Sequence, residues 1–181
     1  TTKAHIKYRN GLPIDCTIQE AYDLNFIHPF KGNVDLEKLV AALRSYEKFI
    51  SYILITVTCN QVGGQPVSLE NIKRVSAIAK KYKVPLFYDG ARFAENAFFI
   101  KEREHRYRRN SIRQIVKEMM LHVDGMLMSA KKDAIVPMGG FIALRNENLY
   151  KKLCSIATLM EGLVGFISNP KRMTGYGGMS G

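Results

Sequence analysis

The chain has 181 residues, 46% of them hydrophobic, so it can bury a substantial core and is not a disordered tail. Twenty-seven Lys and Arg against 16 Asp and Glu give a formal net charge of +11, which suits nucleic acid, anionic cofactors or anionic lipid. No run approaches the roughly 20 apolar residues of a membrane span, and the three widely spaced cysteines suggest neither a disulfide framework nor a zinc cluster. We therefore expect a soluble, cytoplasmic protein.

The two ends of the chain are typical of an internal piece. It begins with Thr1 instead of an initiator Met, and it stops in the glycine-rich stretch 178–181. No internal repeat or low-complexity tract divides it. We expect a fragment of a longer protein that folds as one unit.

The first half of the chain predicts two helices and two strands. Apolar residues at positions 36, 39, 40 and 43 predict a helix with Asn33 or Asp35 as its N-cap. The β-branched run 52–57 predicts a buried strand. After the loop 63–66, Ser68 can cap a helix that runs to about residue 82, and 84–88 is a second strand.

The second half continues the alternation. We expect a helix over 111–122, strands over 125–128 and 140–144, and a last helix over 146–159. Strands that alternate with helices of about 10 to 15 residues indicate crossover units. The predicted fold class is therefore α/β, with a mostly parallel sheet flanked by helices.

Polar residues follow three of these strands closely. Asn60 comes after the first strand, Asp89 ends the second, and the segment 129–132 follows the third. In open α/β sheets, ligands bind beyond the carboxyl ends of the strands. We expect these residues to converge at one rim of the sheet.

An amine and a carboxylate at that rim suit pyridoxal phosphate. A lysine holds this cofactor as an imine, and a carboxylate beside the ring nitrogen keeps the ring a protonated electron sink. We expect Lys132 to be partly desolvated after its strand, which would favour its neutral, nucleophilic form. The alternatives are that Asp89 caps a helix with Arg92 nearby, and that Lys131 and Lys132 are solvated turn residues.

A basic run over 101–113 leaves a second class of function open. Its residues fit a solvated helix face and loop, or an RNA-binding stripe. A basic nucleic-acid-binding module, or a fragment without catalysis, is therefore the alternative to an enzyme.

Five segments together resemble the β-eliminating lyases, the family of tryptophanase and tyrosine phenol-lyase. They are 28–35, 56–60, 63–68, 89–97 and 129–134, in the family's order and at about its spacing. The family is a fold-type I, pyridoxal-phosphate-dependent group of homotetramers activated by a monovalent cation. The resemblance implies that residues 1–181 are the central part of the cofactor-binding large domain.

The resemblance also implies roles around the cofactor ring. Lys132 would form the imine with pyridoxal phosphate and later remove the α-proton of the substrate. Asp89 would pair with the ring nitrogen. Asn60 and Arg92 would approach the phenolic oxygen, where fixed donors suit negative charge.

Further roles concern the phosphate and the cation. By the same resemblance Ser129 would contact the phosphate, with Lys131 beside it. The backbone carbonyl of Pro137 matches a position that helps bind the cation, potassium. The family's other phosphate-binding and substrate-binding segments correspond to sequence outside 1–181, and the segment 163–172 is additional to the family pattern.

The implied reaction is β-elimination of an aromatic amino acid, with tryptophan converted to indole, pyruvate and ammonia. The segments 80–82, 91–96, 129–134 and 136–140 look more like the tryptophanase pattern than that of tyrosine phenol-lyase. Tyrosine phenol-lyase or another β-eliminating lyase is the alternative within the family.

Overall fold

The computed structural model describes residues 2–161, 166–169 and 172–174. Within these residues the main sheet has the strands β1 (Ile53–Thr56), β2 (Leu86–Asp89), β3 (Gly125–Ser129) and β4 (Gly140–Leu144), in that spatial order. The first three are parallel, and β4 runs antiparallel to β3. This confirms the predicted α/β class with a mostly parallel sheet and adds an antiparallel edge strand.

Helices connect the strands and extend beyond them. The α-helices are α1 (Thr2–Tyr8), α2 (Leu36–Tyr46), α3 (Leu69–Tyr82), α4 (Phe93–Arg103), α5 (Ile112–Met120) and α6 (Glu147–Glu161). Short 3-10 helices are η1 (Gln19–Tyr22), η2 (Glu47–Phe49), η3 (Asn60–Val62) and η4 (His105–Tyr107). A separate hairpin pairs β5 (Phe166–Asn169) with β6 (Arg172–Thr174).

Three helices begin at side chains that accept backbone hydrogen bonds. Asp35 caps α2, because its carboxylate accepts from the second and third N–H groups of the helix at 3.0 Å each. Ser68 caps α3, as predicted. Ser111 and Gln114 form a reciprocal capping box at the start of α5.

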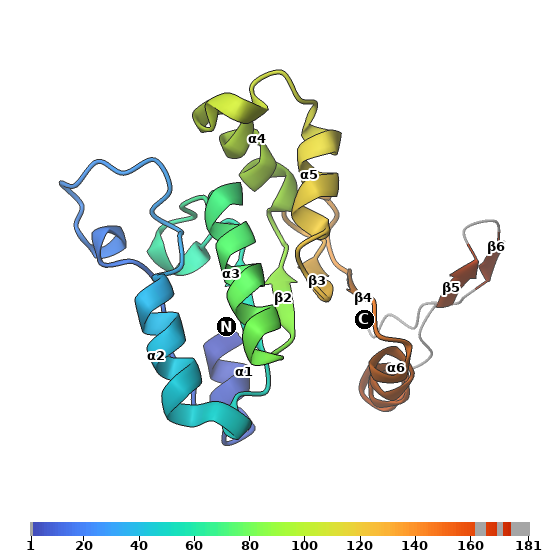
Figure 1. Ribbon diagram of the computed structural model, residues 1–181. Helices are drawn as coiled ribbons and strands as arrows, with labels where there is room; N and C mark the ends of the chain where they lie inside the picture. The colour runs from blue at the N-terminus through green and yellow to red at the C-terminus, as the bar shows by residue number, and fades with distance from the viewer. Residues whose placement is uncertain (1, 162–165, 170–171, 175–181) are drawn as a thin grey trace.

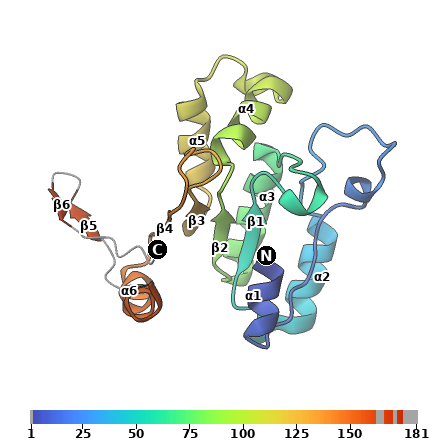
Figure 2. The ribbon, with the colours of Figure 1, turned by 180° about the vertical axis from the view of Figure 1, so that it is seen from behind.

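Different helices pack on the two faces of the sheet. In Figure 1, α3 lies in front of the sheet, and in Figure 2, seen from behind, α1 and β1 come to the front. The α3 side holds the core, where Ile55, Leu86 and Tyr88 are almost completely buried among helix residues such as Ile72 and Met119. The Tyr88 hydroxyl donates to the Met119 carbonyl at 3.1 Å, and burial raises the pKa of this phenol.

The run 52–57 contains the predicted strand, β1, whose burial is complete only on one face. In β1 and in β2 the side chains alternate between buried and half-buried. The cause is that the described helices pack mainly on one face, while α1, which has no buried residue, lies on the other. The half-buried face of the sheet borders the candidate site.

The helices α1 and α4 were not among the predicted helices. The sequence 93–103 forms α4, which packs against α5 and whose Asn96 is fully buried. Asn96 accepts from the Val67 N–H at 2.9 Å and donates to the Val67 carbonyl at 3.0 Å, so α4 is fixed to the segment before α3. Of the additional segment 163–172, residues 166–169 form β5 and Arg172 begins β6, while 163–165 and 170–171 lie outside the described residues.

Candidate active site

Six of the seven predicted site residues line one cavity of about 1190 Å³. Its wall includes Asn60, Asp89, Arg92, Ser129, Lys131 and Lys132. Pro137 lies outside this cavity, exposed in the loop between β3 and β4. The structure therefore brings six of the seven predicted residues together.

The parallel strands explain this convergence. Asp89 is the last residue of β2 and pairs in register with Thr56 of β1 and Leu127 of β3. Ser129 ends β3, and η3 begins at Asn60 a few residues after β1. Because β1, β2 and β3 point the same way, their following residues meet at one edge of the sheet.

Arg92 and Asn60 are bonded to each other at this edge. The Arg92 Nη1 donates to the Asn60 Oδ1 at 3.1 Å. The Arg92 backbone N–H donates to the Val57 carbonyl at 3.2 Å, which holds the start of α4 against the end of β1. A longer ion pair of 3.7 Å joins Arg92 Nε to Glu95.

Asp89 has a partner that the sequence did not indicate. The hydroxyl of Thr2, on α1, donates to Asp89 Oδ2 at 3.3 Å. The sequence reading that Asp89 caps a helix is wrong, since the N-cap of α4 is Arg92 and makes no side-chain cap bond. The Asp89 carboxylate is thus a cavity-wall group.

Asp133 supplies the missing cap from the lysine loop. Its Oδ2 accepts from the backbone N–H groups of Ala94 at 2.7 Å and Glu95 at 3.1 Å. This fastens the loop after Ser129 to the first turn of α4. Lys132 itself is exposed, so the expected partial desolvation is not found.

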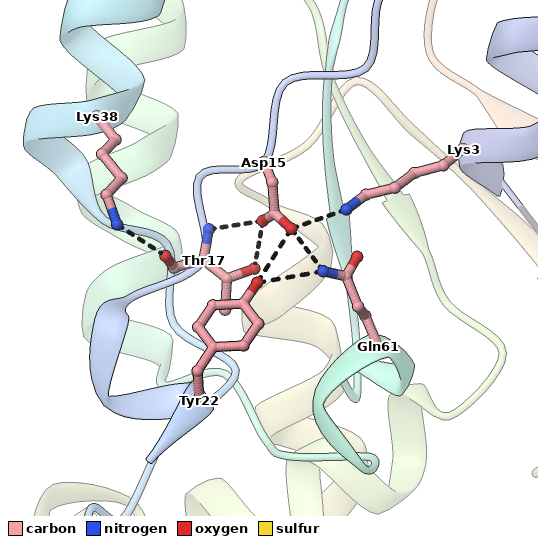
Figure 3. A network of polar contacts seen from close by, with 6 residues as sticks. All are labelled: Lys3, Asp15, Thr17, Tyr22, Lys38 and Gln61. Atoms are coloured by element: carbon pink, nitrogen blue, oxygen red, sulfur yellow. Dashed lines mark hydrogen bonds and ion pairs between the residues drawn. The ribbon is translucent and has the colours of Figure 1, made fainter.

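A second polar network forms another part of the cavity wall, which includes Lys3, Asp15, Thr17 and Gln61 (Figure 3). The Asp15 carboxylate accepts from Lys3 Nζ at 2.7 Å, from the Thr17 hydroxyl at 2.7 Å and the Thr17 N–H at 3.0 Å, from Tyr22, and from Gln61. Burial works against the charged form, but the hydrogen bonds from Lys3, Thr17 and Gln61 outweigh it and hold the pKa of Asp15 well below its usual range.

Comparison with known proteins identifies the family. The model of the family described as beta-eliminating lyase matches residues 1–179. The chain belongs to the β-eliminating lyase family. Across all 181 of its residues it is 46% identical to a Trichomonas vaginalis protein named "Probable beta-eliminating lyase".

Relatives with two different named activities are almost equally similar to this family member. It is 42% identical to a tryptophanase of Haemophilus influenzae and 41% identical to a tyrosine phenol-lyase of Pasteurella multocida, over 182 aligned residues in each case. The chain spans 37% to 38% of the length of these relatives. A Listeria monocytogenes structure described as an L-allo-threonine aldolase shares the fold, with a TM-score of 0.50 and 21% identity over 68% of this chain and 30% of that one.

Membership of the β-eliminating lyase family implies pyridoxal phosphate, and the cavity residues fit it. The Asp89 carboxylate suits the ring nitrogen of this cofactor, and the Arg92 guanidinium suits its phenolic oxygen. The amines of Lys131 and Lys132 and the hydroxyl of Ser129 suit its aldehyde and phosphate. The cavity wall also contains Thr58, whose buried Oγ1 has no hydrogen-bond partner among the described residues. A polar ligand would satisfy such a group.

Two residues of the basic run 101–113 in this lyase-family chain bind backbone carbonyls. Lys101 Nζ donates to the carbonyls of Arg108 at 2.8 Å and Asn110 at 2.7 Å. Arg103 donates to the Pro29 carbonyl at 2.6 Å and lies over the Phe99 ring. These contacts place Lys101 and Arg103 in structural roles at the end of α4.

In the part of the chain that the structure describes, no cluster of three or more His, Cys, Asp or Glu side chains could hold a metal ion. Among the helices of that part, none combines the length and the apolar character that crossing a membrane requires.

Sequence reasoning missed three residues that support the site. Thr2 and Asp15 stand in a stretch with no recognised motif, and their partners are distant in the sequence. Asp133 lies inside the segment 129–134, directly after the two lysines, so its position was a signal that could have been used.

Proposed function

We propose that this chain is the central part of the cofactor-binding domain of a pyridoxal-phosphate-dependent lyase. The observation that supports this most is that Lys132 and Asp89, an amine and a carboxylate from different strand ends, border one cavity. The proposed reaction is β-elimination of an aromatic amino acid, with tryptophan giving indole, pyruvate and ammonia.

Asp89 and Lys132 have different proposed roles at the cofactor ring. When bound, pyridoxal phosphate supplies an electron sink for the α-carbon of the amino acid. Asp89 holds the proton on the ring nitrogen. Lys132 would hold the cofactor through Nζ, and its free amine would take the proton from the substrate α-carbon.

The remaining residues bind and orient. Arg92 and Asn60 are bonded to each other at 3.1 Å, and their remaining N–H groups would donate to the phenolic oxygen. The Ser129 hydroxyl and the Lys131 ammonium bind the phosphate.

The substrate is proposed from sequence segments. Residues 91–96 and 136–140 favour the tryptophanase pattern. The named relatives include a tyrosine phenol-lyase of nearly equal identity, so tyrosine is the alternative substrate.

Assembly and cation are proposed from the family alone. We expect the full chain to form a homotetramer in the cytoplasm and to require potassium, with the Pro137 carbonyl among the ligands. Mass determination in solution, and activity with potassium replaced by sodium, test these two points.

The function is tested with the full chain supplied with pyridoxal phosphate and with tryptophan or tyrosine in parallel. Indole and pyruvate should form from tryptophan, and Lys132→Ala should lower the rate by a hundredfold or more, about the contribution of a general base. Lys152→Ala, an exposed lysine on α6, is the matched control and should change nothing.

Other outcomes are informative. Phenol without indole would assign the alternative substrate. A folded protein that takes up no cofactor and binds RNA in a salt-dependent way would overturn the proposal in favour of a nucleic-acid-binding module.

A further inference from the structure

Asp15 accepts hydrogen bonds from several separate segments of the chain. It is not one of the residues predicted to contact the cofactor. Figure 3 shows its carboxylate between Lys3 of α1, Thr17, Tyr22 of η1 and Gln61 of η3. Both carboxylate oxygens accept, and one donor is a lysine ammonium, so these bonds are of the stronger, charge-assisted kind.

The first branch of this network leads to Arg92. Gln61 is the neighbour of Asn60 in η3, a 3-10 helix of three residues that lacks a side-chain cap. The Gln61 amide binds Asp15 and also the Tyr22 hydroxyl, at 3.1 Å for the latter. A short helix held at Gln61 therefore holds Asn60 where it accepts from Arg92.

The second branch leads to Asp89. Lys3 is the neighbour of Thr2 in α1, and Thr2 donates to Asp89. Helix α1 has seven residues, none of them buried, so apolar packing contributes little to its placement. The 2.7 Å ion pair of Lys3 with Asp15 is then a main attachment of this helix beside the cavity.

We propose that Asp15 is a positioning residue of the cofactor site. Through Gln61 it fixes Asn60 beside Arg92, and through Lys3 it fixes Thr2 beside Asp89. The inference rests on the proposed function, because it assigns Asp15 an effect on a bound pyridoxal ring.

The test compares variants of the full chain by the visible absorbance of bound pyridoxal phosphate and its change with pH. Asp15→Ala should shift the midpoint of that titration by about one pH unit and weaken cofactor binding about tenfold, the loss of one charge-assisted hydrogen bond. Gln61→Ala, which cuts only the branch to Asn60, should reproduce the titration shift. Asp15→Glu, which keeps the charge, should restore part of the binding.

Ser111→Ala is the matched control for a purely structural effect. It removes the cap of α5, far from this network, and should lower the melting temperature without moving the titration. If Asp15→Ala behaves like Ser111→Ala, Asp15 serves only stability and the proposal is wrong.

A measurement without cofactor separates this proposal from the proposed function. Hydrogen exchange of the apo chain should become faster at the Gly63 and Gly64 amides in Asp15→Ala, since both donate within the η3 loop. Unchanged exchange there would contradict the positioning role. If exchange rises but the wild-type chain takes up no pyridoxal phosphate, the restraint on η3 stands, and both the proposed function and the assigned role at the cofactor fall.

Discussion

Gly90 sits at the turn after Asp89, in close contact with β3. Its N–H donates to the Leu127 carbonyl at 2.8 Å, and a Cβ at this position would overlap the buried Met126 side chain, 2.8 Å from its Cγ. A larger residue here would force the Met126 side chain to move, so the carboxylate of Asp89 follows a tightly packed turn.

An alanine at position 90 should clash with the Met126 side chain. Gly90→Ala should lower the free energy of unfolding by about 1 to 3 kcal/mol through overpacking. In a Met126→Ala background the same change should cost little, as a urea double-mutant cycle would measure. Equal costs in both backgrounds would show that Met126 is not the obstacle.

Asp15 is the residue from which a pH effect follows. Its carboxyl stays ionised in the folded chain to lower pH than in the unfolded chain, because the hydrogen bonds lower its pKa. Below about pH 4 the unfolded state takes up a proton that the folded state does not, so this contribution is present at higher pH and is lost on acidification.

Asp15→Asn should therefore flatten the acid side of the stability curve. Wild type and variant are compared by urea unfolding between about pH 5 and pH 2. The stability of wild type should fall more steeply than that of the variant. Parallel curves would contradict the lowered pKa.

At the scale of elements, α4 depends on a cap from another part of the chain. Its own N-cap, Arg92, supplies no side-chain bond, and Asp133 accepts from the first turn instead. A single carboxylate thus connects the helix that begins after Arg92 with the loop that carries Lys132.

Removing that carboxylate should loosen the helix start. Asp133→Ala is expected to lower the free energy of unfolding by about 1 kcal/mol, whereas Asp133→Asn, which keeps an acceptor oxygen, should cost less. Urea unfolding measures both. A larger loss for Asn than for Ala would show that the cap bonds are not what Asp133 contributes.

Some of the helices and strands could be predicted from the sequence, and others could not. Strands over 52–57 and 84–88 were predicted because β-branched and aromatic runs between turns favour the strand conformation. Helix α1 was missed because it buries no residue and so has no apolar stripe to detect.

For the whole molecule, the convergence of Asn60, Asp89 and Ser129 was predictable because strand direction alone brings strand ends together. The supporting contacts were not. Gln61 lies 46 positions from Asp15, and Asp133 lies 39 from Ala94, so only the fold reveals these pairs. The exposure of Lys132 was likewise not predicted from the sequence, which favoured partial desolvation after the strand.

In the proposed function, one lysine at this sheet edge carries the cofactor. This assignment is tested by adding pyridoxal phosphate to the full chain, reducing with borohydride and mapping the labelled peptide. We predict the label on Lys132, retained in Lys131→Ala and lost in Lys132→Ala. A label on Lys131 or on another lysine, or none in a folded preparation, would contradict the account.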